Sequence, residues 1–287
     1  MPIEHLKPLL DWAVQELRRI DSELPQLDAR LLLQHATGLS REDLIVEPER
    51  QVAPGIAENF RALIARRQAH EPVSRILGER EFYGRPFRLT PAVLDPRPDT
   101  ETIVNLALPL MNRDCRILDL GTGSGAIIVT LLAERPDAAG VAVDLSPAAL
   151  AVAAVNAETL GVARRINFIP GNWFEPVSGS PLSGRFNLIV SNPPYIPAGD
   201  IAGLEPDVRN YDPHLALIGG SDGLDSYRSI AAGAGLYLAP GGTVLVELGA
   251  GQAEDVKAIF VKAGYHLVQQ AIDLGGHIRG LAFRPAG

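Results

Sequence analysis

The sequence predicts an α/β fold: a doubly wound, mostly parallel sheet of seven strands with an antiparallel edge, preceded by a small all-α domain and a β-hairpin connector. Three observations predict it. Residues 3–70 keep apolar side chains at helical spacing. From residue 91 onward, strand-like runs alternate with helix-like runs. The last two strand-like runs are joined by the short turn "LGGH", which makes them antiparallel. We therefore expect a helical domain at 1–75, a connector at 76–90 and the α/β domain at 91–287.

The helical domain is predicted from two amphipathic stretches and the end signals between them. One apolar face recurs along residues 6–20 and another along residues 56–67. Gly38 is placed to end a helix, and the run "SRED" from Ser40 begins the next turn in the manner of a capping box. The histidines of this region stand singly, without metal-ligand spacing. We expect no chemical site in this domain.

The connector and the α/β elements follow from changes in period. Residues 76–90 change to a period near two around Gly84, which indicates a hairpin. Strands are expected at 116–120, 140–145, 166–170, 187–190, 241–248, 265–273 and 278–285. Helices are expected near 99–111, 124–134, 147–160, 222–238 and 251–263.

Composition indicates a globular protein of a reducing compartment. The chain is 46% hydrophobic and 21% charged, and its single cysteine, Cys115, rules out an intramolecular disulfide. The first residues carry charges throughout, and no run approaches the roughly 18 apolar residues that a membrane span needs. We expect a cytoplasmic protein that does not contact a membrane.

The charge balance argues against a nucleic-acid-binding surface. The net charge is −8, and residues 93–287 carry 13 Lys or Arg against 20 Asp or Glu. Residues 1–92 carry 13 against 14. Arg61, Arg66 and Arg67 lie close together, but a solvated helix face explains them best. Neither part of the chain is basic.

A glycine-rich turn is the first pattern that carries chemistry. In "ILDLGTGSGAI", an apolar strand runs into Gly121, Thr122, Gly123, Ser124 and Gly125, and a helix follows. Glycine permits positive φ and lets backbone N–H groups approach a ligand at a helix N-terminus. The spacing departs from the G-x-G-x-x-G dinucleotide fingerprint, so the turn alone indicates a nucleotide-like ligand without naming it.

Two further residues point to an adenosine. Asp144 ends the next strand, where a carboxylate accepts hydrogen bonds from both ribose hydroxyls. Its alternative role is to cap the helix near Pro147, but Ser146 fits the cap better. Trp173, after the third strand, could flank an adenine ring, and a core position explains it equally well.

The corner "SNPPY" ends the fourth strand. The first and fourth strands flank the point where strand order reverses in such sheets, so the glycine turn and Asn192 should share one crevice. Asn192 offers a side-chain carbonyl and Pro193 a backbone carbonyl. Neither proline has a backbone donor, so we expect the chain to leave the carbonyls of Pro193 and Pro194 free, and Tyr195 offers a flat ring.

Two acceptors and an aromatic face suit a planar NH₂ group, such as a carboxamide or the exocyclic amine of a base. Hydrogen bonds to both hydrogens would orient the nitrogen lone pair toward an electrophile. These bonds would strengthen as the nitrogen gains positive charge. With an adenosine-binding half beside the corner, the electrophile implied is the methyl sulfonium of S-adenosylmethionine. In-line transfer needs mainly proximity and alignment, and the proton can leave to water afterwards. No metal is expected.

These residues resemble the class I, Rossmann-like S-adenosylmethionine-dependent methyltransferases with an N-P-P-Y motif. More narrowly, they resemble the release-factor glutamine methyltransferases of the PrmC or HemK type. The resemblance runs nearly end to end, through "ILGEREFYGRPFRLTPAVLDPRPDTE", "ILDLGTGSGAI", "AVDLSPAAL", "LIVSNPPYIP" and "EPDVRNYDPHLALIGGSDGLDSYRSI". One departure is Asp95, where the family usually shows an aliphatic residue, and it puts the packing around Arg97 in question.

The resemblance implies a substrate and a set of contacts. It implies methylation of the glutamine amide in the Gly-Gly-Gln motif of peptide chain release factors, which tunes translation termination, by a monomer whose helical domain helps to bind the factor. S-Adenosylhomocysteine would be the product. Residues Gly121 to Gly125, Asp144, Trp173 and Asn192 would contact the cofactor, and Asn192 to Tyr195 the substrate glutamine.

Two alternative functions follow from the same residues. An N-P-P-Y corner also fits the exocyclic amine of adenine or guanine in DNA or RNA, but such an enzyme should show a basic cleft. A non-catalytic protein that binds an adenosyl ligand would need only the cofactor half. The intact corner and the acidic charge balance favour a protein glutamine as the substrate.

Overall fold

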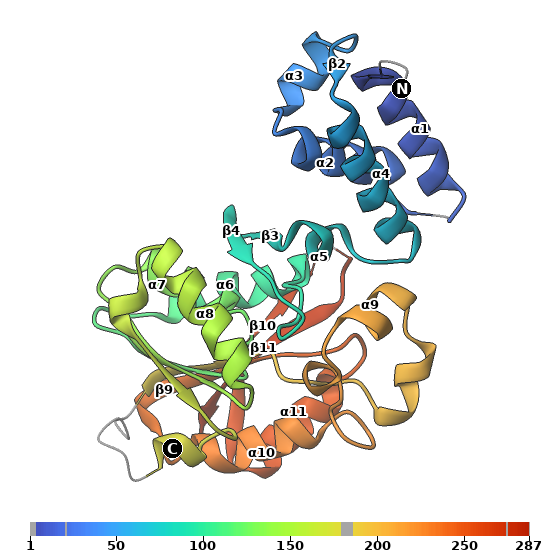
Figure 1. Cartoon of the computed structure of the whole chain (residues 1–287). Coiled ribbons are helices and arrows are strands. Elements are labelled where there is room, and N and C mark those ends of the chain that lie inside the picture. Colours follow the sequence, from blue (N-terminus) through green and yellow to red (C-terminus); the bar gives the residue numbers. More distant parts are fainter. Residues whose placement is uncertain (1–3, 21, 179–185, 274, 287) are drawn as a thin grey trace. The chain divides into compact units, whose positions relative to one another are not determined.

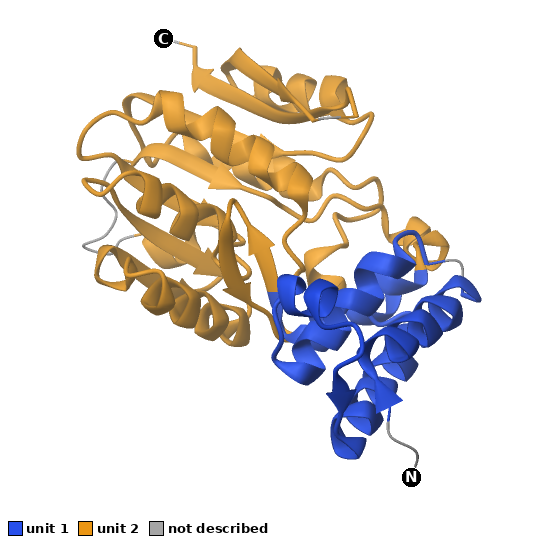
Figure 2. Ribbon diagram, turned by 90° about the horizontal axis from the view of Figure 1, so that it is seen from above, with its two compact units in different colours: residues 1–79, 206–211 blue, residues 80–205, 212–287 orange. Residues whose placement is uncertain are grey.

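The computed structural model describes residues 4–20, 22–178, 186–273 and 275–286. The chain divides into two compact units (Figure 2). Unit 1 consists of Met1–Glu79 and Pro206–Tyr211, and unit 2 of Arg80–Glu205 and Asp212–Gly287. The division into a recognition domain at 1–75 and a methyltransferase domain at 91–287 stays a prediction.

Unit 1 is helical, apart from one short strand pairing. Its helices are α1 (Leu6–Arg18), α2 (Pro25–Thr37), α3 (Arg41–Val46), α4 (Pro54–Gln68), α5 (Val73–Leu77) and α9 (Pro206–Tyr211). Strands β1 (Glu4–His5) and β2 (Gln51–Val52) pair antiparallel, which the helical periodicity did not predict. Apolar faces of α1, α2 and α4 form a common core.

The helix-end signals of unit 1 act as expected. Gly38 ends α2 in the left-handed conformation, with φ of 70°. The Ser40 side chain accepts a hydrogen bond from the backbone N–H of Asp43, whose carboxylate accepts one from the Ser40 N–H. This reciprocal pairing is the capping box that the sequence predicted.

The hairpin connector is present but begins later than residue 76. Helix α5 extends to Leu77 and ends at Gly78, whose φ is 71°. Strands β3 (Glu79–Phe82) and β4 (Arg85–Arg88) follow. The rings of Phe82 and Phe87 meet edge to face, 5.9 Å apart, and join the core of unit 2. A helical turn therefore replaces the first residues of the predicted hairpin.

The sheet of unit 2 has seven strands, in agreement with the prediction. They are β5 (Arg116–Leu120), β6 (Ala139–Asp144), β7 (Ile166–Pro170), β8 (Phe186–Ser191), β9 (Leu238–Glu247), β10 (Tyr265–Ile272) and β11 (Ile278–Pro285). Their order is β10-β11-β9-β8-β5-β6-β7. Strands β5 to β9 run parallel, whereas β11 pairs antiparallel with both β9 and β10.

Helices cover both faces of this sheet, which makes it doubly wound (Figure 1). One face packs against α6 (Glu101–Ala107), α7 (Ala126–Glu134) and α8 (Pro147–Thr159), and the other against α10 (Asp225–Ala234) and α11 (Ala253–Lys262). Short 3₁₀ helices lie at Pro98–Thr100, Leu108–Leu110, Ala163–Arg165, Glu175–Val177, Ala198–Gly203 and His214–Ala216. Within the part of the chain that the structure describes, no helix has both the length and the apolar character to span a bilayer.

Candidate active site

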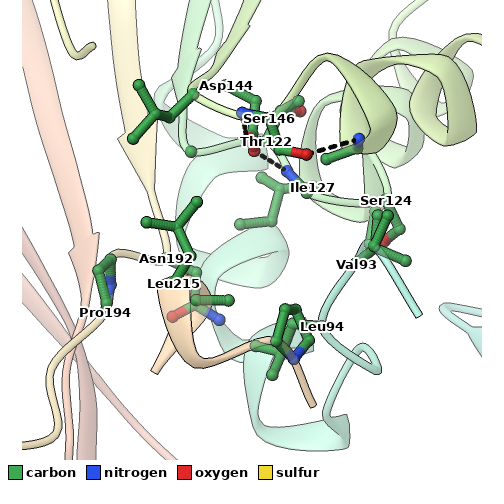
Figure 3. A pocket seen from close by; sticks show the side chains of 18 of the residues that line it. Val93, Leu94, Thr122, Ser124, Ile127, Asp144, Ser146, Asn192, Pro194 and Leu215 are labelled. Carbon is green, nitrogen blue, oxygen red and sulfur yellow. Dashed lines mark hydrogen bonds between the residues drawn. The ribbon is translucent and has the colours of Figure 1, made fainter. Parts of the chain in front are cut away.

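A pocket of about 430 Å³ lies at the carboxyl ends of the parallel strands of unit 2 (Figure 3). The order of the strands explains its position, because β5 lies between β6 and β8 and the sheet reverses there. Of the predicted site residues, the lining includes Gly121, Thr122, Gly123, Ser124, Asp144, Trp173, Asn192 and Pro194. Gly125, Pro193 and Tyr195 are not among the lining residues.

The glycine turn is held by hydrogen bonds to the neighbouring strand. The backbone N–H groups of Gly121 and Thr122 both donate to the carbonyl of Val143, at 2.8 and 3.0 Å. The three glycines of the turn, Gly121, Gly123 and Gly125, all have positive φ. Gly125 also lets α7 approach α8, since an added Cβ would lie 3.1 Å from the Cβ of Ala153. Its place is therefore between the two helices.

Asp119 lies beneath this turn as a buried acid. The Thr122 hydroxyl donates to its carboxyl group at 2.6 Å. Burial raises the pKa of Asp119 to about 7, and the nearby carboxylate of Asp144 adds to the rise. The sequence shows an acidic residue two positions before the turn, but burial is what keeps its proton.

Asp144 faces the pocket and also holds the turn. Its Oδ2 accepts from the N–H of Gly123 at 2.8 Å, and its Oδ1 accepts from the N–H of Ser146 at 2.8 Å. Ser146 caps α8 by accepting from the N–H of Ala149, as the sequence predicted. Each carboxylate oxygen keeps a second lone pair for a ligand hydroxyl.

Trp173 lines the pocket from the segment after β7. Its φ is 45°, a left-handed conformation that is rare for a bulky residue. Part of the ring packs against the core on the side of α10 and α11. Trp173 therefore lies partly against the core and partly at the pocket, and its contact with an adenine ring stays a prediction.

The Asn192 corner is anchored from several sides. Asn192 Nδ2 donates to the hydroxyl of Thr100 at 3.2 Å. The Ser191 hydroxyl, one residue earlier, donates to the carbonyl of Leu120 at 2.7 Å and joins the ends of β8 and β5. Among the described residues, neither Asn192 Oδ1 nor the Pro193 carbonyl receives a hydrogen bond. These are the two acceptors that the sequence singled out.

The expectation that the chain leaves the carbonyls of both prolines free was wrong for Pro194. The Ser226 hydroxyl on α10 donates to the Pro194 carbonyl at 3.0 Å. The next carbonyl, that of Tyr195, accepts from Gln252 Nε2 at 3.0 Å. Burial raises the pKa of the Tyr195 phenol to about 12, aided by the nearby carboxyl of Glu247. Sequence distance conceals these donors, because Ser226 and Gln252 lie far along the chain.

The sequence interpretation also missed residues that complete the pocket wall. They come from the segment after the hairpin and from the segment before α10: Ala92, Val93, Leu94, Pro96, Thr100, Pro213, Leu215, Ala216 and Ile218. They lie in segments that the family resemblance covers, but none carries a chemical motif that would have indicated a place at the pocket.

Two family models match the chain. The model described as the PrmC N-terminal domain matches residues 8–78, and the model described as the methyltransferase small domain matches residues 99–202. The release factor glutamine methyltransferase of Rhodospirillum rubrum is 48% identical over 278 residues, covering 96% of this chain and 84% of the relative. The chain belongs to the release factor glutamine methyltransferase family.

A second relative of this release factor glutamine methyltransferase family is similar over most of both chains. The enzyme of the same name from Agrobacterium fabrum is 47% identical and covers 91% of this chain and 90% of its own. Solved structures share the methyltransferase fold alone. A Pyrococcus furiosus methyltransferase has a TM-score of 0.53 at 19% identity, over 80% of this chain and 99% of that one. A ribosomal protein L11 methylase from Lactobacillus delbrueckii subsp. bulgaricus has a TM-score of 0.51 at 19% identity, over 70% and 86%.

Asp95, the departure from the family pattern, is buried among charged residues. Its backbone N–H donates to Asp212 Oδ1 at 3.5 Å, and Arg97 donates to Asp212 Oδ2 at 2.7 Å. Asp95 itself is 2% exposed, and the Arg80 guanidinium lies 3.9 Å from its carboxylate. The segment around Arg97 is therefore packed despite the substitution.

Proposed function

We propose that this protein transfers a methyl group from S-adenosylmethionine to the side-chain amide nitrogen of the glutamine in the Gly-Gly-Gln motif of peptide chain release factors. The observation that carries the proposal is the pair of unused acceptors, Asn192 Oδ1 and the Pro193 carbonyl, next to the pocket that the glycine turn lines. Two relatives are named for this activity, and the similarity covers 84% and 90% of their lengths.

The pocket residues fit S-adenosylmethionine. Open space lies where a Cβ at Gly121 or Gly123 would stand, so the cofactor can approach the glycine turn closely. The start of α7 adds the positive end of a helix dipole, which would favour the carboxylate of the cofactor. Asp144 would hold the ribose hydroxyls, and Trp173 would lie against the adenine. The cavity volume, about 430 Å³, is in the range that suits a ligand of this size. When bound, the cofactor supplies an electrophilic methyl group and leaves as S-adenosylhomocysteine.

The corner residues would orient the substrate amide. Asn192 Oδ1 and the Pro193 carbonyl would each accept one N–H of the glutamine NH₂ group, which points the nitrogen lone pair away from both acceptors. These hydrogen bonds strengthen as the nitrogen gains positive charge, so they favour the transition state over the ground state. The proton then leaves the amide nitrogen to water.

A protein amide fits the chain better than a nucleobase does. Both parts of the chain have more acidic than basic residues, and a nucleic-acid enzyme would need cations to grip phosphates. The pocket wall includes the apolar residues Leu94, Leu215 and Ile218. We further propose that the protein acts in the cytoplasm, where release factors meet the ribosome. We also propose that it is a monomer, which light scattering would test.

The decisive experiment separates the substrate classes. The protein and S-adenosylmethionine are incubated separately with a release factor, with oligonucleotide DNA and with RNA, and mass spectrometry locates any added methyl group. We expect one methyl on the glutamine of the Gly-Gly-Gln motif and none on a release factor in which that glutamine is replaced by alanine. Methyl found only on nucleic acid would overturn the proposal.

A further inference from the structure

Glu247 is a buried carboxyl group beside Asn192. It is the last residue of β9, and β9 pairs in parallel with β8, the strand that leads into Asn192. Glu247 is 2% exposed, and hydrogen bonding from the side chains of Thr100 and Asn192 favours its charged form. Among the described residues, its Oε2 has no hydrogen-bond partner. Burial of an incompletely paired carboxyl group is costly, so packing alone does not account for it.

The orientation of the Asn192 amide decides what the pocket presents. The amide can offer either its oxygen, which accepts hydrogen bonds, or its NH₂ group, which donates them. Its hydrogen-bond partners determine which of the two faces the pocket. Here Nδ2 donates to Thr100 Oγ1 at 3.2 Å. This orientation leaves Oδ1 as the acceptor for a substrate N–H.

Glu247 makes this orientation the favourable one. An ionised carboxylate only accepts hydrogen bonds, so groups that face it must donate. The Thr100 hydroxyl can accept from Asn192 and give its own proton to Glu247. With the amide reversed, Oδ1 would face the Thr100 oxygen and the carboxylate, and repulsion between acceptors would follow.

We infer that Glu247, together with Thr100, is a positioning residue that fixes the Asn192 amide with its oxygen toward the substrate. The inference rests on the proposed function, because it assigns Asn192 Oδ1 to the substrate amide. Glu247 acts through Asn192 and has no contact with the reacting atoms of its own. Its carboxylate must be ionised to exclude the reversed amide.

The surroundings of Glu247 set the pH above which its carboxylate is ionised and the Asn192 amide is held in this orientation. Burial raises the pKa of Glu247 to about 7, opposed by hydrogen bonding from Thr100 and by the charge of Arg279 on β11. The other charged or titratable groups that face it are Asp99, Tyr195 and Tyr227; the hydroxyl of Tyr227 on α10 donates to the Glu247 backbone carbonyl at 3.0 Å. Below its pKa the protonated carboxyl can donate, and the preference for one amide orientation weakens.

The test is the isosteric change Glu247→Gln, which keeps the volume and adds an NH₂ donor. We expect kcat on the release factor to fall about 10- to 100-fold, the effect expected when a group at the reacting centre is misoriented. The affinity for S-adenosylmethionine, measured by calorimetry, should stay unchanged. The matched control is Glu254→Gln on α11, which makes the same charge change at a side chain that is 85% exposed.

Two readouts distinguish positioning from a merely structural role. In the wild type, kcat should rise with pH through an inflection near 7, and Glu247→Gln should remove this inflection. Asp119 titrates in the same range, so the diagnostic is the inflection that the variant loses. Thr100→Val should reduce kcat comparably, and the double variant should lose little more than either single one. A retained inflection or fully additive losses would overturn the inference.

A spectroscopic measurement separates this inference from the proposed function. The side-chain ¹⁵N–¹H₂ resonances of Asn192, assigned by their loss in Asn192→Ala, should shift as pH crosses 7 in the wild type and remain constant in Glu247→Gln. Absence of that shift sinks the role of Glu247 whatever the substrate is. A shift together with no methyl transfer to the release factor sinks the proposed function instead.

Discussion

Asn192, predicted from the sequence to lie at the ligand crevice, lines the pocket in the structure. The residue type and its place after a strand were enough to predict a side-chain acceptor at the pocket. The partners that hold the amide, Thr100 and Glu247, could not be predicted, because they come from a 3₁₀ helix and a strand far away in the chain. Short-range patterns find the reacting group, whereas only folding brings the supporting groups to it.

Replacing Asn192 by alanine is expected to stop methyl transfer while leaving cofactor binding almost intact. The variant loses the side-chain acceptor whose hydrogen bond strengthens in the transition state, and loss of one such group typically costs about 100- to 1000-fold in kcat. Single-turnover methylation measures the transfer, and titration calorimetry measures S-adenosylmethionine binding. Turnover equal to that of the wild type would remove Asn192 from the reaction.

Replacing Asp144 by alanine is expected to weaken cofactor affinity. The variant loses a carboxylate that faces the pocket and accepts from Gly123 and Ser146. Hydrogen bonds to a charged group contribute about 1.5–3 kcal/mol, so we expect Kd to rise at least tenfold. The control is Asp137→Ala, which removes an exposed carboxylate from the turn before β6. Unaltered calorimetric titration of the Asp144 variant would contradict the ribose contact.

At the scale of elements, period and end signals predicted the sheet and most helices. Strands β5, β7 and β11 have the predicted bounds, and the others differ by one to three residues at an end. The misses have a physical cause. The β1–β2 pairing spans two residues on each side, too few for a period to show, and α5 displaced the start of the hairpin because five residues of helix have no recognisable face.

Gly125→Ala is expected to destabilise the start of α7. Its φ of 80° disfavours a side chain, and the new Cβ would lie 3.1 Å from that of Ala153. We expect the free energy of unfolding to fall by about 1–3 kcal/mol. Adding Ala153→Gly removes one steric contact but leaves the backbone strain, so urea titration of both variants separates the two costs. Equal stability of the wild type and Gly125→Ala would show that neither operates.

At the scale of the whole molecule, two buried acids link stability to pH. Burial raises the pKa of Asp119 and Glu247 to about 7, well above the ordinary values of 3.8 and 4.5. The unfolded chain therefore releases these protons first. Their contribution to stability is complete below about pH 4 and is lost as pH rises through 7, with a slope of up to about 1.4 kcal/mol per pH unit for each group.

We accordingly expect the free energy of unfolding, measured in urea, to decrease from pH 5 to pH 8. The acids with lowered pKa act in the opposite sense, but only at lower pH, where they become protonated; they are Glu4, Asp43, Asp222 and Asp273. In the Asp119→Asn, Glu247→Gln double variant the decrease should be much smaller. If the free energy of unfolding of the double variant fell as steeply with pH as that of the wild type, other groups would cause the decrease. Ionisation of Glu247 would orient Asn192 for methyl transfer, but it lowers the free energy of unfolding.

The path of the chain between its two units could not be predicted from periodicity. Residues 206–211 lie between segments of unit 2 in the sequence but form α9 within unit 1. A helix of six residues has too few positions for an apolar face, and its attachment depends on polar contacts with residues about 140 positions earlier. Arg67 donates to Asp207 at 3.0 Å, and the Tyr211 hydroxyl donates to the Ala69 carbonyl at 2.9 Å.

Arg67→Met is therefore expected to loosen α9 and to weaken unit 1. The Arg67 side chain is 11% exposed and also pairs with Asp28, which is 14% exposed, so the change leaves two carboxylates without their shared cation. We expect a loss of about 1–3 kcal/mol and faster hydrogen exchange in residues 206–211, which mass spectrometry follows by peptide. Asp207→Ala should speed exchange in α9 alone, because the Arg67–Asp28 pair survives it. The neighbouring change Arg66→Met, at a side chain that is 44% exposed, serves as the control. Unchanged exchange across 206–211 in Arg67→Met would mean that the Tyr211 contact and the chain connections suffice to hold α9.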